Sequence, residues 1–174
     1  MVLTAAALSL VSGCGLVGGP QALRQDAPDN MTVTSQMSSR GTILAQYTCH
    51  GAGQSPPIQW SSPPTGTQSL ALVVDSAAAP ITPRANWIVF DISPVTRDMP
   101  AGALPTGARE ARNSSGRSGY DPPCPAGGRH QYRFTIYALS KVLHQPDGTP
   151  LKEAWTAIAR YAIARGRLTA AAAP

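Results

Sequence analysis

The stretch 119–139, GYDPPCPAGGRHQYRFTIYAL, decides how this chain is interpreted. Its first half is a loop rich in glycine and proline, and such residues present backbone in tight turns. Its second half, residues 132–137, alternates in the manner of a half-buried β-strand. His130 lies at the junction of the two halves. Because side chains at such junctions are held on rigid strand structure at the surface, the sequence predicts a binding site near His130.

Strand patterns dominate the chain on either side of this stretch. Further runs of β-branched and apolar residues, separated by proline and glycine clusters, are found at residues 31–35, 42–47, 69–75 and 87–92. The run 69–75 is continuously apolar up to Asp75, which is typical of a central strand covered on both faces. Short strands with frequent turn signals predict an antiparallel sandwich or barrel.

One segment near the C-terminus predicts an amphipathic helix. Apolar residues recur there at the helical spacing, and Gly166 is placed as the residue that ends the helix; the positions are Leu151, Ala154, Trp155, Ile158, Tyr161, Ala162 and Arg165. Trp155 and Tyr161 lie on the apolar stripe, so they are interpreted as core residues rather than cofactor contacts. Residues 169–174 are expected to fray.

The N-terminus predicts export. Residues 1–13 form an apolar segment of signal-peptide length, and Cys14 follows small residues as in a bacterial lipoprotein signal. No Lys or Arg precedes the apolar run, so a plain secretory peptide cleaved elsewhere and an apolar leader without export value remain the alternatives. We predict a signal peptide at 1–13, a lipidated N-terminus and tether at 14–30, a domain at 31–168 and a tail at 169–174.

The basic charge does not predict nucleic-acid binding. Fourteen Lys and Arg residues against nine acidic ones give a net charge of +5, but the basic residues are scattered along the chain. No helix-turn-helix, zinc-finger or basic-aromatic pattern organises them. Arg109, Arg112 and Arg117, on the loop before Gly119, are the best candidates for contact with an acidic partner, although the favoured interpretation is a solvated loop face without a function.

Four blocks of sequence resemble the phosphatidylethanolamine-binding protein family, in its bacterial Raf-kinase-inhibitor-like branch. Residues 119–132 resemble the family block G-Y-x-G-P-x-P-P-x-G-x-x-H-R-Y. The other three blocks are residues 48–60, TCHGAGQSPPIQW, residues 64–72, PTGTQSLAL, and residues 113–120, NSSGRSGY. The blocks occur in the family's order and cover most of the predicted domain. The resemblance implies a mainly β fold, an antiparallel Greek-key β-sandwich with one C-terminal amphipathic helix.

The resemblance also implies a small surface pocket for anions such as phosphoryl head groups. In most members it is lined by the two Asp of D-P-D-A-P, the His of H-W, and the His and Tyr of H-R-Y. Here D-P-D-A-P is replaced by Ser76-Ala77-Ala78-Ala79-Pro80 and H-W by Asn86-Trp87. We therefore expect a degenerate, uncharged pocket with four polar residues: Ser76, Asn86, His130 and Tyr132. Alternatively, His130 only holds its loop by bonding a backbone carbonyl.

Two further residues are interpreted through the same resemblance. Asp75 adjoins Ser76 in an extended run, so its side chain is expected on the opposite face of the sheet unless a bulge intervenes. Cys49 and Cys124 both fall in loops that the family places beside the pocket. We predict a disulfide between them in an exported protein, with two buried free thiols as the alternative.

These features predict a non-catalytic binding protein at the extracytoplasmic face of the cell membrane. It would be anchored through Cys14, or secreted, and would bind a small anion or lipid head group. The alternative is an inhibitor or interaction protein that acts on a protease or other protein partner at the cell surface. No nucleophile with base and acid, no metal-ligand spacing and no cofactor motif occurs, so no enzyme, metal or cofactor is predicted.

Overall fold

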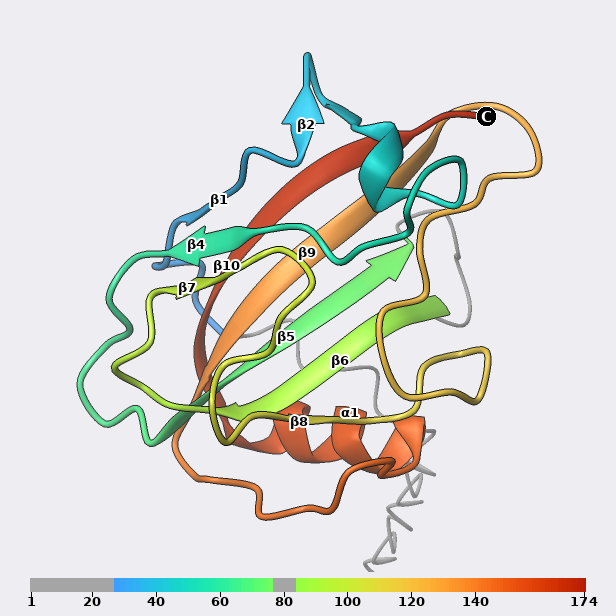
Figure 1. Ribbon diagram of the computed structural model, residues 1–174. Helices are drawn as coiled ribbons and strands as arrows, with labels where there is room; N and C mark the ends of the chain where they lie inside the picture. Colours follow the sequence, from blue (N-terminus) through green and yellow to red (C-terminus); the bar gives the residue numbers. More distant parts are fainter. Residues whose placement is uncertain (1–26, 77–83) are drawn as a thin grey trace, which may run out of the picture.

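The computed structural model describes residues 27–76 and 84–174. Two β-sheets and one α-helix make up this part of the chain, and the family's mainly β architecture is confirmed (Figure 1). The predicted signal peptide, Cys14 and all but the last residues of the tether lie outside the described residues. No helix in the described part is long and apolar enough to cross a membrane.

The small sheet has three strands and the large sheet seven. In the small sheet the order is β1 (Val33–Thr34), β4 (Ile58–Trp60) and β7 (Asp98–Met99). In the large sheet the order is β2 (Ser38–Ser39), β3 (Thr42–Ile43), β10 (Ala162–Ala172), β9 (His130–Leu139), β5 (Ser69–Ser76), β6 (Arg84–Ile92) and β8 (Arg109–Glu110). A 3₁₀ turn, η1 (Ala45–Tyr47), follows β3, and α1 (Leu151–Tyr161) connects β9 to β10.

The large sheet is buried on both faces, which explains the continuous apolar run of β5. Alternate residues such as Leu72, Val74 and Phe134 pack in the cluster that contains Trp60 of the small sheet. The intervening residues, such as Val73, pack on the opposite face in a cluster with Ile158 of α1. Trp155 and Tyr161, interpreted as core residues, are half-buried and pack against the edge of this second cluster.

The C-terminal segment differs from the prediction. The helix ends at Tyr161, and residues Ala162–Ala172 form β10, which pairs antiparallel with β9 from Ala162–Leu139 to Ala172–His130. Gly166 is therefore not a helix cap. The tail predicted at residues 169–174 is also wrong in its start, because β10 continues to Ala172. Ala170–Ala172 are buried in the strand, so the helix-favouring alanines are outweighed by the burial and strand pairing that tertiary structure offers.

Gly166 is needed because another backbone segment crosses β10 at this position. A Cβ atom at Gly166 would lie 2.3 Å from the carbonyl oxygen of Met31 and 2.7 Å from its carbonyl carbon. Met31 is fixed there, since its N–H donates to the carbonyl oxygen of Arg165 at 3.1 Å.

Gly166→Ala is expected to lower the free energy of unfolding by about 2 kcal/mol, because backbone must move to admit the methyl group. Gly127→Ala is the matched control, since a Cβ there meets no atom within 4 Å. The control change is expected to stay within about 0.5 kcal/mol of the parent protein in urea unfolding. Equal effects of the two substitutions would contradict the proposed collision.

Candidate functional site

Three of the four predicted site residues lie at the same end of the large sheet. Ser76 ends β5 and stands directly opposite Tyr132 of β9, while Arg84 of β6 is its partner on the other side. His130 begins β9 two residues before Tyr132, and alternate strand residues share a face. Ser76 and Tyr132 are buried, and burial raises the pKa of the Tyr132 hydroxyl.

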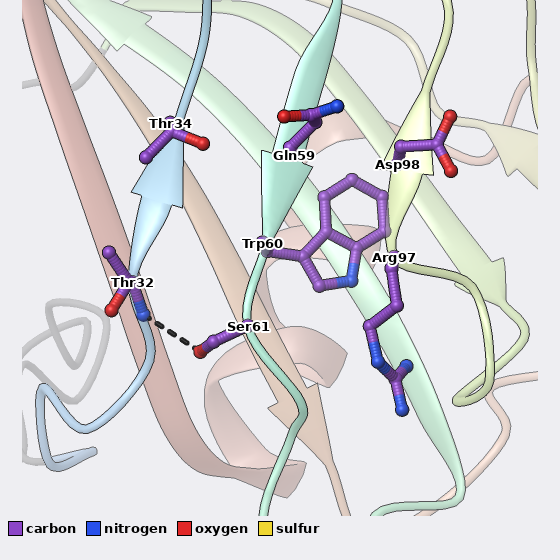
Figure 2. Close-up of a pocket in the computed structure, with 7 residues that line it drawn as sticks. All are labelled: Thr32, Thr34, Gln59, Trp60, Ser61, Arg97 and Asp98. Carbon is purple, nitrogen blue, oxygen red and sulfur yellow. Dashed lines mark hydrogen bonds between the residues drawn. The ribbon is translucent and has the colours of Figure 1, made fainter.

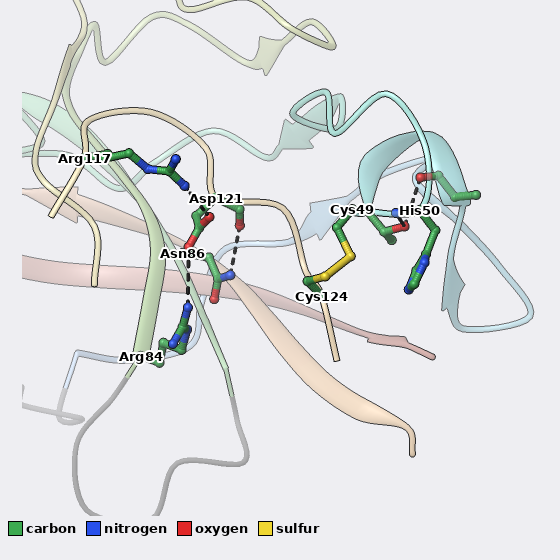
Figure 3. The surroundings of a disulfide bond; sticks show 9 residues. Cys49, His50, Arg84, Asn86, Arg117, Asp121 and Cys124 are labelled. Atoms are coloured by element: carbon green, nitrogen blue, oxygen red, sulfur yellow. Dashed lines mark hydrogen bonds and ion pairs between the residues drawn. A yellow bond between two sulfur atoms is a disulfide. The ribbon is translucent and has the colours of Figure 1, made fainter. Parts of the chain in front are cut away.

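The fourth residue, Asn86, lies at a shift in the strand register. Val74 pairs with Trp87 but Asp75 pairs with Ala85, which leaves Asn86 as the extra residue of a bulge. Its Nδ2 donates to the carbonyl oxygen of Asp121 at 2.9 Å, and the Asp121 N–H donates back to the Asn86 carbonyl oxygen (Figure 3). Asn86 is only 4% exposed, and its Oδ1 has no hydrogen-bond partner in the described part of the chain.

A charged group that sequence reasoning missed borders these residues. The carboxylate of Asp121 lies 3.2 Å from the Arg117 guanidinium and 3.6 Å from that of Arg84, as Figure 3 shows, and it accepts a hydrogen bond from Ser115 Oγ at 2.6 Å. The two arginine side chains remain largely exposed. Two cations and one carboxylate therefore surround the site, which was expected to be uncharged. No sequence signal marked Asp121, because a four-residue spacing such as that from Arg117 indicates a side-chain pair only within a helix, and this segment is a loop.

The disulfide between Cys49 and Cys124 is present, as predicted. It joins the loop that follows Asp121 to the turn after η1 (Figure 3). The Cys49 N–H also donates to the Pro123 carbonyl oxygen at 3.1 Å. The Tyr120 hydroxyl donates to the Tyr47 carbonyl oxygen at 2.9 Å. The glycine- and proline-rich loop is thus fastened on both sides of Asp121.

Asp75 faces away from Ser76, as predicted. Its carboxylate pairs with the Arg133 guanidinium on the helix side of the sheet. Burial raises the pKa of the Asp75 carboxyl, and the hydrogen bond from Arg133 opposes that shift. Asp75 therefore does not place a carboxylate beside Ser76.

His130 is half-buried at the start of β9, and its imidazole makes no hydrogen bond to the described residues. Within residues 27–76 and 84–174, no backbone carbonyl accepts a hydrogen bond from His130, so the alternative that His130 holds its loop in this way has no support there. Residues Ala77–Pro80, which replace most of the family's D-P-D-A-P, lie outside the described residues.

Two surface grooves lie elsewhere on the molecule. One, of about 380 Å³, opens on the small sheet beside Trp60 and Asp98, where Figure 2 shows mainly polar side chains. The other, of about 690 Å³, runs between α1 and residues 141–145 and is called the α1 groove below. Neither is lined by Ser76, Asn86, His130 or Tyr132. Within the described ranges, no three His, Cys, Asp or Glu residues are grouped to hold a metal ion.

Comparison with known proteins agrees with this architecture. The family model for phosphatidylethanolamine-binding protein matches residues 34–172. The putative lipoprotein LppC of Mycobacterium tuberculosis is 38% identical, over 95% of this chain and 92% of the relative. Two crystal structures are similar: a putative phosphatidylethanolamine-binding protein homologue, CT736 of Chlamydia trachomatis, and YbcL of E. coli. CT736 has a TM-score of 0.73 and 35% identity, and the match covers 81% of this chain and 95% of that chain. YbcL has a TM-score of 0.76 and 26% identity, and the match covers 83% of this chain and 98% of that chain.

Proposed function

The chain belongs to the phosphatidylethanolamine-binding protein family, and from this premise we propose that it is a non-catalytic, extracytoplasmic protein that binds a small anion or phospholipid head group beside Asn86. The observation that carries the proposal is the buried Oδ1 of Asn86, which has no hydrogen-bond partner within residues 27–76 and 84–174. Asn86 bonds Asp121, and Asp121 pairs with two exposed arginines, Arg84 and Arg117. A buried acceptor without a donor costs about 1–3 kcal/mol, so a donor from a ligand or water is favoured there.

The charges near Asn86 support an anionic ligand despite the loss of both family aspartates. Arg84 and Arg117 share one carboxylate, and exposed ion pairs of this kind contribute less than about 1 kcal/mol. Their remaining N–H donors are therefore available to a phosphoryl group at little energetic cost. A head group that combines phosphate with an ammonium offers Asn86 Oδ1 a charged donor while its phosphate stays at the arginines, whereas inorganic phosphate has only its own O–H groups to donate.

The extracytoplasmic location rests on the N-terminal sequence, with Cys14 as the proposed lipidation site. Support comes from a relative that is named a putative lipoprotein and covers nearly the whole chain. The disulfide also fits an oxidising compartment, because paired cysteines are kept reduced in most cytosols.

Thermal-shift titration of the whole chain with phosphate and phosphoethanolamine tests this function. At about one hundred times the dissociation constant a ligand adds about 2.7 kcal/mol of stability, a rise of several degrees in melting temperature. We expect Arg84→Met to weaken binding about tenfold and phosphoethanolamine to bind more tightly than phosphate.

The matched control is Arg40→Met, which removes an exposed arginine from the turn between β2 and β3. It is expected to leave both titrations unchanged. His130→Ala is compared in the same assay, and a reduced shift would place the imidazole at the ligand. No shift with either compound at millimolar concentration would refute anion binding at this site.

A further inference from the structure

The α1 groove lies at the opposite end of β9 from His130. Lys141 and Leu143 follow the last residue of β9, Leu139, whereas His130 is the first. A strand of ten residues spans about 30 Å, so the α1 groove is separate from the proposed head-group site.

The side chains of the α1 groove give it an apolar floor and a basic rim. Its apolar lining includes Leu143, Pro150 and Ala157, and its charged lining consists of Lys141, Lys152 and Arg160 against one carboxylate, Glu153. An excess of cations around apolar surface favours a partner that combines acidic groups with apolar ones.

Two of these cations converge on a single aromatic ring. The Lys141 Nζ lies 5.4 Å from the centre of the Tyr161 ring, and the Arg160 Cζ lies 5.5 Å from the same centre. Neither side chain forms an ion pair with an acidic residue in the described part of the chain. The ring attracts each cation, while the two like charges at one ring raise the local positive potential, so an anion bound beside the Tyr161 ring would be stabilised by both.

A hydrogen-bond acceptor in the α1 groove distinguishes between classes of anionic partner. The Gln145 Oε1 is buried and has no partner among the described residues, while its Nε2 donates to Glu153 at 3.4 Å. A fatty carboxylate or alkyl phosphate brings an anion but no donor when ionised. A peptide brings backbone N–H donors together with acidic side chains, and it satisfies both features.

The wall opposite α1 is held in place before any partner binds. The Leu143 and His144 N–H groups both donate to the Asp91 carboxylate, at 2.7 and 3.0 Å. A preformed wall reduces the entropy lost on binding. The 11 residues of α1 extend about 16 Å, which accommodates about five residues of an extended peptide.

We propose that the α1 groove binds an extended acidic, partly apolar segment of a protein partner, with carboxylates at Lys141 and Arg160. This binding is independent of the proposed head-group site. It gives the chain a second interaction surface, so a partner and a small ligand can be held at the same time.

Fluorescence anisotropy of the whole chain with a labelled peptide of alternating leucine and glutamate tests the proposal. Arg160→Glu and Lys141→Glu are each expected to weaken binding about tenfold or more, because each reverses a charge at the Tyr161 ring. Arg40→Glu, the same change at a distant exposed arginine, is expected to alter the affinity less than about twofold. A peptide with glutamine in place of glutamate is expected to bind about tenfold more weakly than the acidic one.

Unchanged melting temperatures would show that the charge-reversal variants remain folded. If one of these variants does not fold, Tyr161→Leu takes its place: it removes the ring without reversing a charge and is expected to weaken binding. Equal weakening by Arg40→Glu would mean nonspecific charge attraction and would overturn the proposal. Binding of laurate or dodecyl phosphate, without binding of the acidic peptide, would assign the groove to an amphiphile instead. Arg84→Met, which tests the head-group site, is expected to leave peptide affinity unchanged. A negative result for one of the two proposed sites therefore leaves the test of the other valid.

Discussion

Replacing both Cys49 and Cys124 with serine is expected to lower the free energy of unfolding by about 4 kcal/mol. The two residues are 75 positions apart, and a cross-link over a loop of this length removes much of the unfolded chain's conformational freedom. Both cysteines are exposed in the folded state, so serine causes little loss of apolar burial. The loss of stability is therefore assigned to the cross-link itself.

Urea unfolding of the parent protein and the double variant measures this effect. Because the uncrosslinked chain is more expanded when unfolded, the dependence of the unfolding free energy on urea should also become steeper. Reductant is the control: it should bring the parent protein to the stability of the variant and leave the variant unaffected. A loss below about 1 kcal/mol would contradict the prediction. It would mean that residual structure in the unfolded chain already restricts it nearly as strongly as the disulfide does.

The disulfide also concerns ligand binding, because it fastens the loop that carries Asp121. The same loop is held by the Tyr120 hydroxyl on Tyr47 and by the paired hydrogen bonds between Asp121 and Asn86. These contacts explain why a loop rich in glycine and proline can position side chains beside the sheet. Binding of phosphoethanolamine is consequently a second property to compare in the reduced protein.

How far the sequence predicts this molecule depends on the range of the interactions involved. The apolar run of β5 and the alternation in β9 are local patterns, and both strands were predicted from them. The segment after Tyr161 was misassigned because its alanines favour a helix, whereas pairing with β9 and the crossing of Met31 at Gly166 come from residues far away in the chain. The local sequence pattern does not contain information about such long-range contacts.

The site shows the same division. Ser76 and Tyr132 were identified by resemblance, and the structure pairs them directly across two strands. Asp121 was missed, because its importance arises from Arg84, 37 positions earlier, and from a bulge that turns Asn86 toward it. A charge that depends on tertiary contact cannot be assigned from the block in which it stands.

The ion pair between Asp75 and Arg133 carries the other large expected effect. Arg133→Met is expected to lower the free energy of unfolding by about 3 kcal/mol at neutral pH, because it leaves a buried carboxylate without its partner. Asp75→Asn in the same background should restore much of the loss, since the amide carries no charge. Arg40→Met is the control, because Arg40 is exposed in the turn between β2 and β3. A loss there as large as that of Arg133→Met would contradict the assignment.

The pH dependence of this variant follows from the sign of the Asp75 shift. Burial raises the folded-state pKa of the Asp75 carboxyl above its ordinary value of 3.8, so between the two values the folded protein binds more protons than the unfolded chain, and its stability falls as the pH rises. Removing Arg133 takes away the hydrogen bond and the larger of the two arginine contributions that oppose this shift, and so raises the pKa of the Asp75 carboxyl further; Arg167 is the other opposing cation. The stability difference between Arg133→Met and the parent protein should therefore be large at about pH 7 and much smaller at about pH 4, where the carboxyl takes up a proton. Urea unfolding at both values tests this, and a difference independent of pH would mean that lost packing of the arginine stem, rather than the buried charge, causes the destabilisation.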